Sequence, residues 1–129
     1  MSLARNLDVL VVDDTTVSRA LLPNNLQELG FTRLRVENDG KEALHTLMMK
    51  PAHLVVSDYN MPGVNGLELL RALREFPATR GCGFILVTGR MDATLLEEGR
   101  KWGLNNYLTK PFTTSGLKAC IEMVVGKLA

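Results

Sequence analysis

Residues 54–63 read LVVSDYNMPG, a short apolar run that stops at an acid and then enters a turn. The run has no charged residue before Asp58, which is typical of a strand buried on both faces of a sheet. Pro62 and Gly63 favour a turn directly afterwards. Asp58 therefore stands where a buried strand ends. Because acids often close strands simply by entering water, its role depends on what the other strand ends carry.

Other short apolar runs have the same character. Together with HLVVS (53–57), they are LDVLVV (7–12), RLRVE (33–37), GFILVT (83–88) and NNYLT (105–109). Segments with helical spacing lie between them, near 40–50 and 66–76 and at the end of the chain. In the last segment, apolar residues from Leu117 to Leu128 recur at i, i+3, i+4, i+7, i+8 and i+11. Strand and helix alternate five times, which predicts a parallel sheet with right-handed crossovers and helices on both faces.

Individual residues indicate where the helices begin, end or are disturbed. The predicted helix stops are Gly30, Pro51 and Gly103. Asn65 and Gly66 are expected to cap the helix that begins near residue 66. Pro23 falls inside the first helical segment, where it removes one backbone hydrogen bond and costs about 3 kcal/mol if it is not accommodated. We therefore predict a kink or a local break at Pro23.

Length and composition limit the classes of function. A chain of 129 residues has the usual size of one domain, so we expect a single domain over 1–129. Fifteen Lys and Arg against fourteen Asp and Glu give a net charge of +1, which offers no broad basis for binding nucleic acid or an anionic membrane. Cys82 and Cys120 lack metal or disulfide spacing, and no apolar run is long enough to span a bilayer. We expect a cytoplasmic protein.

The carboxyl ends of the predicted strands carry the candidate functional residues. In a doubly wound sheet, the ligand site lies beyond these ends, where the strand order reverses. The residues that this rule selects are Asp13, Asp14, Asp58, Thr88 and Lys110. Two carboxylates about 4 Å apart repel by about 4 kcal/mol at an effective dielectric near 20, so three acids at one edge need compensating charge. Mg²⁺ suits this edge because it binds carboxylates, waters and a phosphate oxygen together, and Lys110 adds a second positive charge.

An aspartate beside Mg²⁺, a lysine and a hydroxyl group is a workable phosphoryl acceptor. A carboxylate can attack phosphorus and form an aspartyl phosphate. Phosphoryl transfer asks a protein mainly for alignment and charge neutralisation. The metal, Lys110 and Thr88 meet these needs without a separate general base.

Four sequence motifs cover the strand ends and the segments that follow them. In chain order they read VLVVDD (9–14), LVVSDYNMPGVNGLELL (54–70), LVTG (86–89) and YLTKPF (107–112). Over essentially the whole chain, they resemble the receiver domain of bacterial two-component response regulators, most closely the stand-alone chemotaxis type. The resemblance implies a flavodoxin-like (βα)₅ doubly wound parallel sheet with strand order 2-1-3-4-5. It also implies a signalling switch rather than a dedicated enzyme.

The resemblance assigns the acceptor and the metal ligands. Asp58 would be the residue that a histidine kinase phosphorylates. Mg²⁺ would be held by Asp13, Asp14 and Asp58, with Asp13 acting through water. The backbone carbonyl of Asn60 would complete the protein ligands.

The resemblance also implies how phosphorylation is read. Thr88 and Lys110 would contact the phosphoryl group, and Tyr107 would turn inward when Thr88 moves toward the phosphate. Asn60 and Arg90 would flank the phosphoryl group and tune its lifetime. The face formed by the fourth helix, the fifth strand and the fifth helix would then change for a partner protein.

The implied partners are a chemotaxis-type histidine kinase and either a flagellar motor switch protein or a phosphatase; we expect a monomer. Receivers that bind the flagellar switch usually carry lysines near the start of the fourth helix, where this chain has Met91, Asp92 and Ala93. A phosphate sink that drains a shared kinase is therefore an alternative. An Mg²⁺-dependent aspartyl phosphatase of the haloacid-dehalogenase type would need DxD after the first strand, whereas Asp13 and Asp14 are adjacent.

Overall fold

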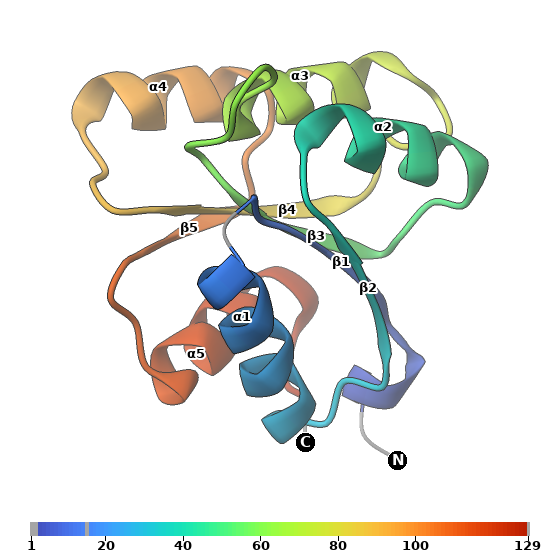
Figure 1. Ribbon diagram of the computed structural model, residues 1–129, viewed down its shortest axis with the longest axis vertical. Helices are drawn as coiled ribbons and strands as arrows, with labels where there is room; N and C mark the ends of the chain where they lie inside the picture. The colour runs from blue at the N-terminus through green and yellow to red at the C-terminus, as the bar shows by residue number, and fades with distance from the viewer. Residues whose placement is uncertain (1–2, 15, 129) are drawn as a thin grey trace.

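A computed structural model describes residues 3–14 and 16–128, without the side chains of 16–20. Its elements are η1 (Leu3–Asn6), β1 (Asp8–Val12), α1 (Thr16–Glu28), β2 (Arg33–Glu37), α2 (Gly40–Met49), β3 (Leu54–Asp58), α3 (Gly66–Glu75), β4 (Gly83–Thr88), α4 (Ala93–Lys101), β5 (Asn106–Thr109) and α5 (Thr114–Val125). The five strands are parallel and lie in the order β2-β1-β3-β4-β5, which confirms the predicted topology. Helices α1 and α5 cover one face of the sheet, and α2, α3 and α4 cover the other (Figure 1). Within the described ranges, no helix is long and apolar enough to cross a membrane.

Strand register brings the central carboxyl ends to one level. Val12 of β1 lies opposite Ser57 of β3. Asp58, the last residue of β3, lies opposite Val87 of β4. Asp13 therefore leaves β1 at the level at which Asp58 ends β3. Every observed strand end falls within one residue of its predicted position.

Two apolar cores hold the helices on the sheet. Along β1, Val9 and Val11 face the core under α1 and α5, whereas Leu10 and Val12 face the core under α2 and α3. All five residues of β3 are buried, which explains the near-continuous apolar run of this strand. Asp58 is therefore positioned by a strand that is packed on both faces.

Helix α1 runs unbroken through Pro23, so a local break there is the wrong prediction. Leu22 and Leu26 lie on either side of Pro23 and are only 2% and 0% exposed. Burying a leucine side chain contributes about 1.5–3 kcal/mol. Two such residues offset the roughly 3 kcal/mol that an interior proline costs. A kink at this position stays a prediction.

The ends of the other helices follow local signals. Asn65 caps α3 as predicted: its side chain accepts from the backbone N–H of Glu68 at 2.8 Å, and the Glu68 carboxylate accepts from the Asn65 N–H at 3.0 Å. At the chain end, the apolar stripe suggested helix as far as Leu128, but α5 ends at Val125. Gly126 takes φ = 97°, a conformation that favours glycine, and the chain leaves the helix there.

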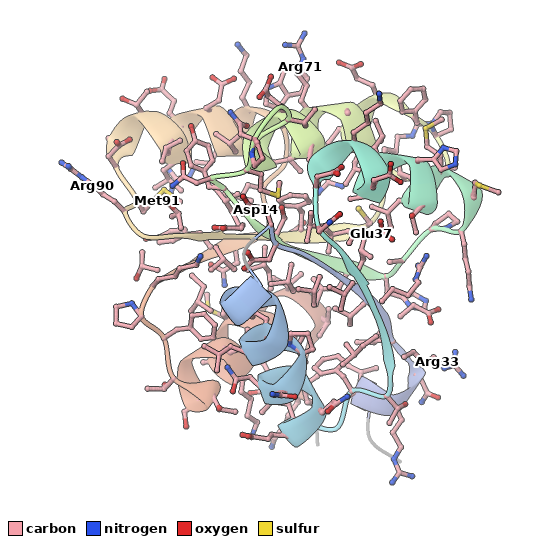
Figure 2. All side chains as sticks on the ribbon, viewed as in Figure 1. Asp14, Arg33, Glu37, Arg71, Arg90 and Met91 are labelled. Carbon is pink, nitrogen blue, oxygen red and sulfur yellow. The ribbon has the colours of Figure 1, made fainter. Side chains whose placement is uncertain are left out.

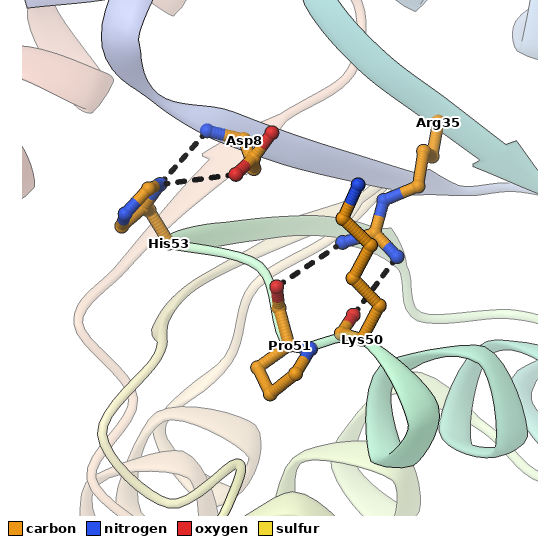
Figure 3. A network of polar contacts seen from close by, with 5 residues as sticks. All are labelled: Asp8, Arg35, Lys50, Pro51 and His53. Carbon is orange, nitrogen blue, oxygen red and sulfur yellow. Dashed lines mark hydrogen bonds and ion pairs between the residues drawn. The ribbon is translucent and has the colours of Figure 1, made fainter.

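Polar contacts join β1, β2 and the segment between α2 and β3 (Figure 3). Nδ1 of His53 accepts a hydrogen bond from the backbone N–H of Asp8 at 2.9 Å and lies 3.8 Å from its carboxylate. Arg35 donates to the carbonyl oxygens of Lys50 and Pro51 at 2.9 and 3.3 Å. These contacts join the starts of β1 and β3 and hold the chain that follows α2, so their role is structural.

Candidate functional site

Three carboxylates meet at the carboxyl edge of the sheet. One oxygen from each of Asp13, Asp14 and Asp58 lies within 4.8 Å of the other two. Asp13 is 0% exposed and Asp58 is 5% exposed, whereas Asp14 is half-buried. Figure 2 shows Asp14 where β1 ends, between the two helix layers. The cluster therefore offers hard oxygen ligands within reach of one divalent cation.

Lys110 brings a positive charge to the cluster. Its Nζ lies 3.2 Å from Oδ1 of Asp58. The residue follows β5, and its backbone N–H donates to the carbonyl oxygen of Thr88 at 2.8 Å. The Lys110–Pro111 peptide bond is cis. The backbone contact and the ion pair together hold the ammonium group over the carboxylate that ends β3.

Burial raises the pKa of Asp58, because the charged carboxylate loses hydration at this edge. Two effects of Lys110, its charge and its hydrogen bond, lower the pKa. The negative charge of Asp13 raises it, and a hydrogen bond from the backbone of Tyr59 lowers it. The net effect is a raised pKa of Asp58, so Lys110 alone does not fully compensate for burying the negative charge.

We expect Asp58→Asn to increase the free energy of unfolding in the absence of divalent cations. A carboxyl whose pKa is raised by folding stabilises the protein fully only below its unfolded pKa, and that contribution is lost as the pH rises through the folded pKa. The advantage of the variant is therefore largest at neutral pH and shrinks as the pH falls toward about 4. Urea unfolding at several pH values measures this, with the exposed-charge variant Glu97→Gln as control. If the stability difference between Asp58→Asn and wild type stayed the same in acid, burial of the Asp58 charge would not be its cause.

The hydroxyl group of Thr88 is engaged by the loop that follows β4. Thr88 is 2% exposed, and its Oγ1 donates to the carbonyl oxygen of Arg90 at 3.1 Å and accepts from the Arg90 N–H at 3.3 Å. The Arg90 side chain is exposed and points outward, away from Asp14 (Figure 2). The hydroxyl has one proton, so Thr88 must give up its bond to the Arg90 carbonyl before it can donate to a group at the acid cluster. The Arg90 guanidinium lies outside the cluster.

Two other predicted residues lie further out. Asn60 is exposed in the loop after β3, two residues beyond Asp58. Tyr107 lies on β5, with 37% of its surface exposed. Because of this exposure, the side chain of Tyr107 is at the surface in this structure. Its backbone carbonyl oxygen accepts a hydrogen bond from the Cys120 thiol at 3.4 Å, which links β5 to α5.

A cavity of about 240 Å³ opens beside the cluster. It lies between α1 and the loop that joins β5 to α5, and its lining residues are Asp13, Leu21, Leu22, Lys110, Pro111 and Phe112. Its walls are mostly apolar. A molecule that entered from this side would meet an apolar surface before it reached the charged groups.

Gly66 belongs to the site although the sequence predicted only a capping position there. A Cβ atom at Gly66 would lie 2.6 Å from the carbonyl oxygen of Asp58 and 2.6 Å from the side chain of Leu86. The Gly66 N–H donates to the carbonyl oxygen of Tyr59 at 2.9 Å. The start of α3 therefore packs directly on the backbone that carries Asp58.

We expect Gly66→Ala to destabilise the protein by about 1–3 kcal/mol, the usual cost of overpacking a close contact. The added methyl group meets backbone at Asp58, so the strand end or α3 must shift. Urea unfolding measures the loss. Gly81→Ala is the matched control, because an added Cβ there meets nothing within 4 Å. Equal stability of the two variants would contradict the close approach.

Comparisons with known proteins agree on one family. The model of the family described as response regulator receiver domain matches residues 9–122. A probable chemotaxis protein CheY of Rhizobium etli is 41% identical, over 99% of this chain and 99% of its own. Chemotaxis protein CheY of Pseudomonas aeruginosa is 36% identical, over 92% of this chain and 95% of its own. Among solved structures, chemotaxis protein CheY4 of Vibrio cholerae has a TM-score of 0.86 at 28% identity, covering 92% of this chain and 98% of its own.

Proposed function

The chain belongs to the response regulator receiver domain family, and on this premise we propose that it is a phosphorylation-operated switch whose phosphoryl acceptor is Asp58. The observation that carries the proposal is the 3.2 Å contact between Lys110 and Asp58 inside the acid cluster. It joins a nucleophilic carboxylate, a fixed cation and two further carboxylates at one edge. The whole of 1–129 would act as one receiver domain, a signalling protein rather than a dedicated enzyme.

The proposed reaction moves a phosphoryl group from a phosphohistidine of a kinase to Asp58. A carboxylate oxygen of Asp58 forms the new P–O bond while the P–N bond breaks, and the departing imidazole takes up a proton. Lys110 would contact the new phosphoryl oxygens and balance their charge. Because Asp58 is ionised when it attacks, no group has to remove a proton from it.

The donor set at the cluster fits Mg²⁺, which prefers carboxylate, carbonyl and water oxygens. Asp13, Asp14, Asp58 and the backbone carbonyl of Asn60 would hold the ion, with Asp13 acting through water. When bound, Mg²⁺ would supply charge neutralisation for the acceptor and for the phosphoryl oxygens. It would also relieve the mutual repulsion of the carboxylates.

The switch would begin at Thr88. Its hydroxyl would exchange the two bonds to the Arg90 backbone for one to the phosphoryl group, which releases the loop before α4. Tyr107, now at the surface, would turn inward into the space that Thr88 leaves. Asn60 and Arg90 would tune how fast water removes the phosphoryl group.

Chemotaxis is the proposed setting, because relatives named as chemotaxis proteins are 41% and 36% identical to this chain. The partners would be a chemotaxis-type histidine kinase in the cytoplasm and, for output, a flagellar motor switch protein or a phosphatase. The protein would act as a monomer.

A phosphate sink is the second candidate, favoured by the start of α4. Asp92 caps this helix by accepting from the Leu95 N–H at 2.9 Å, so an acid stands where motor-binding receivers usually have lysines. Capture of flagellar switch protein that increases on phosphorylation would rule out a pure sink. Capture that does not change would count against motor binding.

Phosphoryl uptake from a small phosphodonor tests the function. Wild type is expected to gain the mass of one phosphoryl group when Mg²⁺ is present and little without it. Asp58→Asn is expected to gain none, whereas the control Glu97→Gln behaves like wild type. Equal labelling of Asp58→Asn and wild type would overturn the assignment.

A further inference from the structure

Helix α4 is attached to the protein unequally along its length. All nine of its residues are described, and Gly99, near the carboxyl end, is the only buried one. A Cβ atom at Gly99 would lie 2.7 Å from the side chain of Leu104. The Leu104 N–H also donates to the Gly99 carbonyl oxygen at 2.8 Å. The carboxyl end of α4 therefore rests directly on the segment that leads into β5.

Arg74, in the last turn of α3, binds this carboxyl end and the entry to β4 with its guanidinium group. Nε donates to the carbonyl oxygen of Trp102 at 3.0 Å, and Nη2 donates to that of Gly103 at 2.9 Å. The remaining acceptors are the carbonyl oxygens of Arg80 (2.9 Å) and Cys82 (2.7 Å) and the side-chain oxygen of Asn105 (3.1 Å). The five N–H donors of an arginine thus meet five oxygen atoms. One side chain ties α3, the entry to β4 and the exit from α4 together.

A second contact supports the same end. The guanidinium carbon of Arg71 lies 5.0 Å from the centre of the Trp102 ring, within the range of a cation–π interaction. The indole N–H of Trp102 lies 3.4 Å from a carboxylate oxygen of Glu98 and donates to it. Figure 2 shows Arg71 on the helix layer that contains α3 and α4.

In the part of the chain that the structure describes, residues 92–95 make no hydrogen bond to another helix or strand, and Met91 and Leu95 attach this end only by packing against the core under α2 and α3. Asp92 caps only its own helix, and the preceding loop is held by the Thr88 hydroxyl through the backbone of Arg90. A groove of about 340 Å³ lies between α3 and α4, and Thr94, Leu95, Glu98 and Trp102 line it on the α4 side. The amino half of α4 is therefore held by apolar packing alone, whereas hydrogen bonds from Arg74 also hold the carboxyl end.

We propose that Arg74 makes the carboxyl end of α4 a fixed hinge. A change at the acid cluster then moves the amino end of α4 while the carboxyl end stays in place. The trigger rests on the proposed function, because only the bond exchange at Thr88 connects phosphorylation to this loop. The hinge itself needs no phosphorylation. Arginine is required because its planar group presents five donors in fixed directions, whereas a lysine offers three from one point.

Hydrogen exchange in the unphosphorylated protein tests the hinge. The reporters are the backbone amides of Trp102, Gly103, Leu104 and Asn105, each of which donates a hydrogen bond. Arg74→Gln is expected to speed their exchange by about tenfold or more, the loss that one charge-assisted hydrogen bond implies, while amides of β1 and β3 stay unchanged. Arg74→Lys is expected to fail to restore slow exchange. The control Arg100→Gln removes an exposed charge from α4 itself and is expected to change nothing.

Two outcomes would overturn the hinge. Exchange that rises equally in β3 and at Trp102–Asn105 would mean that Arg74 supports only global stability. Full protection in Arg74→Lys would mean that its charge matters and its geometry does not.

Repeating the measurement on phosphorylated protein tests the swing. Exchange at Leu95 and Leu96 is expected to change, whereas the emission of Trp102, the only tryptophan, stays constant in wild type and shifts in Arg74→Gln. An emission shift in phosphorylated wild type as large as in the variant would contradict the hinge. If Asp58 takes up no phosphoryl group, the proposed function fails in the mass assay, while the exchange pattern of the unphosphorylated protein still decides on Arg74.

Discussion

Lys110→Ala is expected to slow phosphoryl uptake from a small donor by about 10²–10³-fold, the usual cost of removing one preorganised charge from a transition state. The ammonium group lies 3.2 Å from the Asp58 carboxylate, where it can bind the oxygens of the transferred phosphoryl group. Its charge also lowers the pKa of Asp58, so its removal leaves less of the ionised nucleophile. Time-resolved mass spectrometry at saturating Mg²⁺ gives the rate.

Lys118→Ala is the matched control for that experiment, because Lys118 is an exposed lysine of α5. It is expected to take up the phosphoryl group at the wild-type rate. A Lys110→Ala rate within about threefold of wild type would mean that the lysine is not aligned with the transition state, since even one such donor usually contributes far more.

Asp14→Asn is expected to weaken Mg²⁺ binding by more than roughly 100-fold, and Asp13→Asn by about 10- to 100-fold, the range for outer-shell partners. The difference follows from the proposed geometry, in which Asp14 binds the ion directly and Asp13 binds through water. Both variants remove one charge from a cluster whose carboxylate oxygens lie within 4.8 Å of one another.

Thermal unfolding at increasing Mg²⁺ concentration measures these affinities. Wild type is expected to gain about 1.4 kcal/mol of stability at ten times the dissociation constant. Glu37→Gln, at the end of β2, serves as a control that should bind Mg²⁺ like wild type. A larger loss for Asp13→Asn than for Asp14→Asn would reverse the assignment of the direct ligand.

The strands and the acid-bearing edge of the sheet were predictable because buried strands have continuous apolar sequences. Continuous apolar runs gave strands such as β3 to within one residue, and parallel strands place their carboxyl ends at one edge. Asp58 and Lys110 follow from that rule alone, and the structure places them 3.2 Å apart. Strand order came only with the family resemblance, because periodicity does not say which strands are neighbours.

Contacts between distant segments were not predictable from periodicity. Arg74 looks like any arginine near a helix end, yet its five bonds depend on where β4 and the exit of α4 lie. At Gly66 the sequence predicts only a cap, since nothing in a sequence reveals that the backbone of Asp58 approaches it. The predicted break at Pro23 is wrong for the same reason. The cost of a proline inside a helix can be estimated from the sequence, whereas the burial of Leu22 and Leu26 that offsets it cannot.

Locating the phosphoryl group in the labelled wild-type chain tests most directly whether Asp58 carries it. Borohydride reduces an aspartyl phosphate to homoserine, so protein labelled by a phosphodonor in Mg²⁺ can be trapped, digested and sequenced by mass spectrometry. We expect homoserine at position 58 and unmodified aspartate at Asp13 and Asp14. Homoserine at another aspartate, or a phosphoryl group on a hydroxyl or imidazole, would contradict the account.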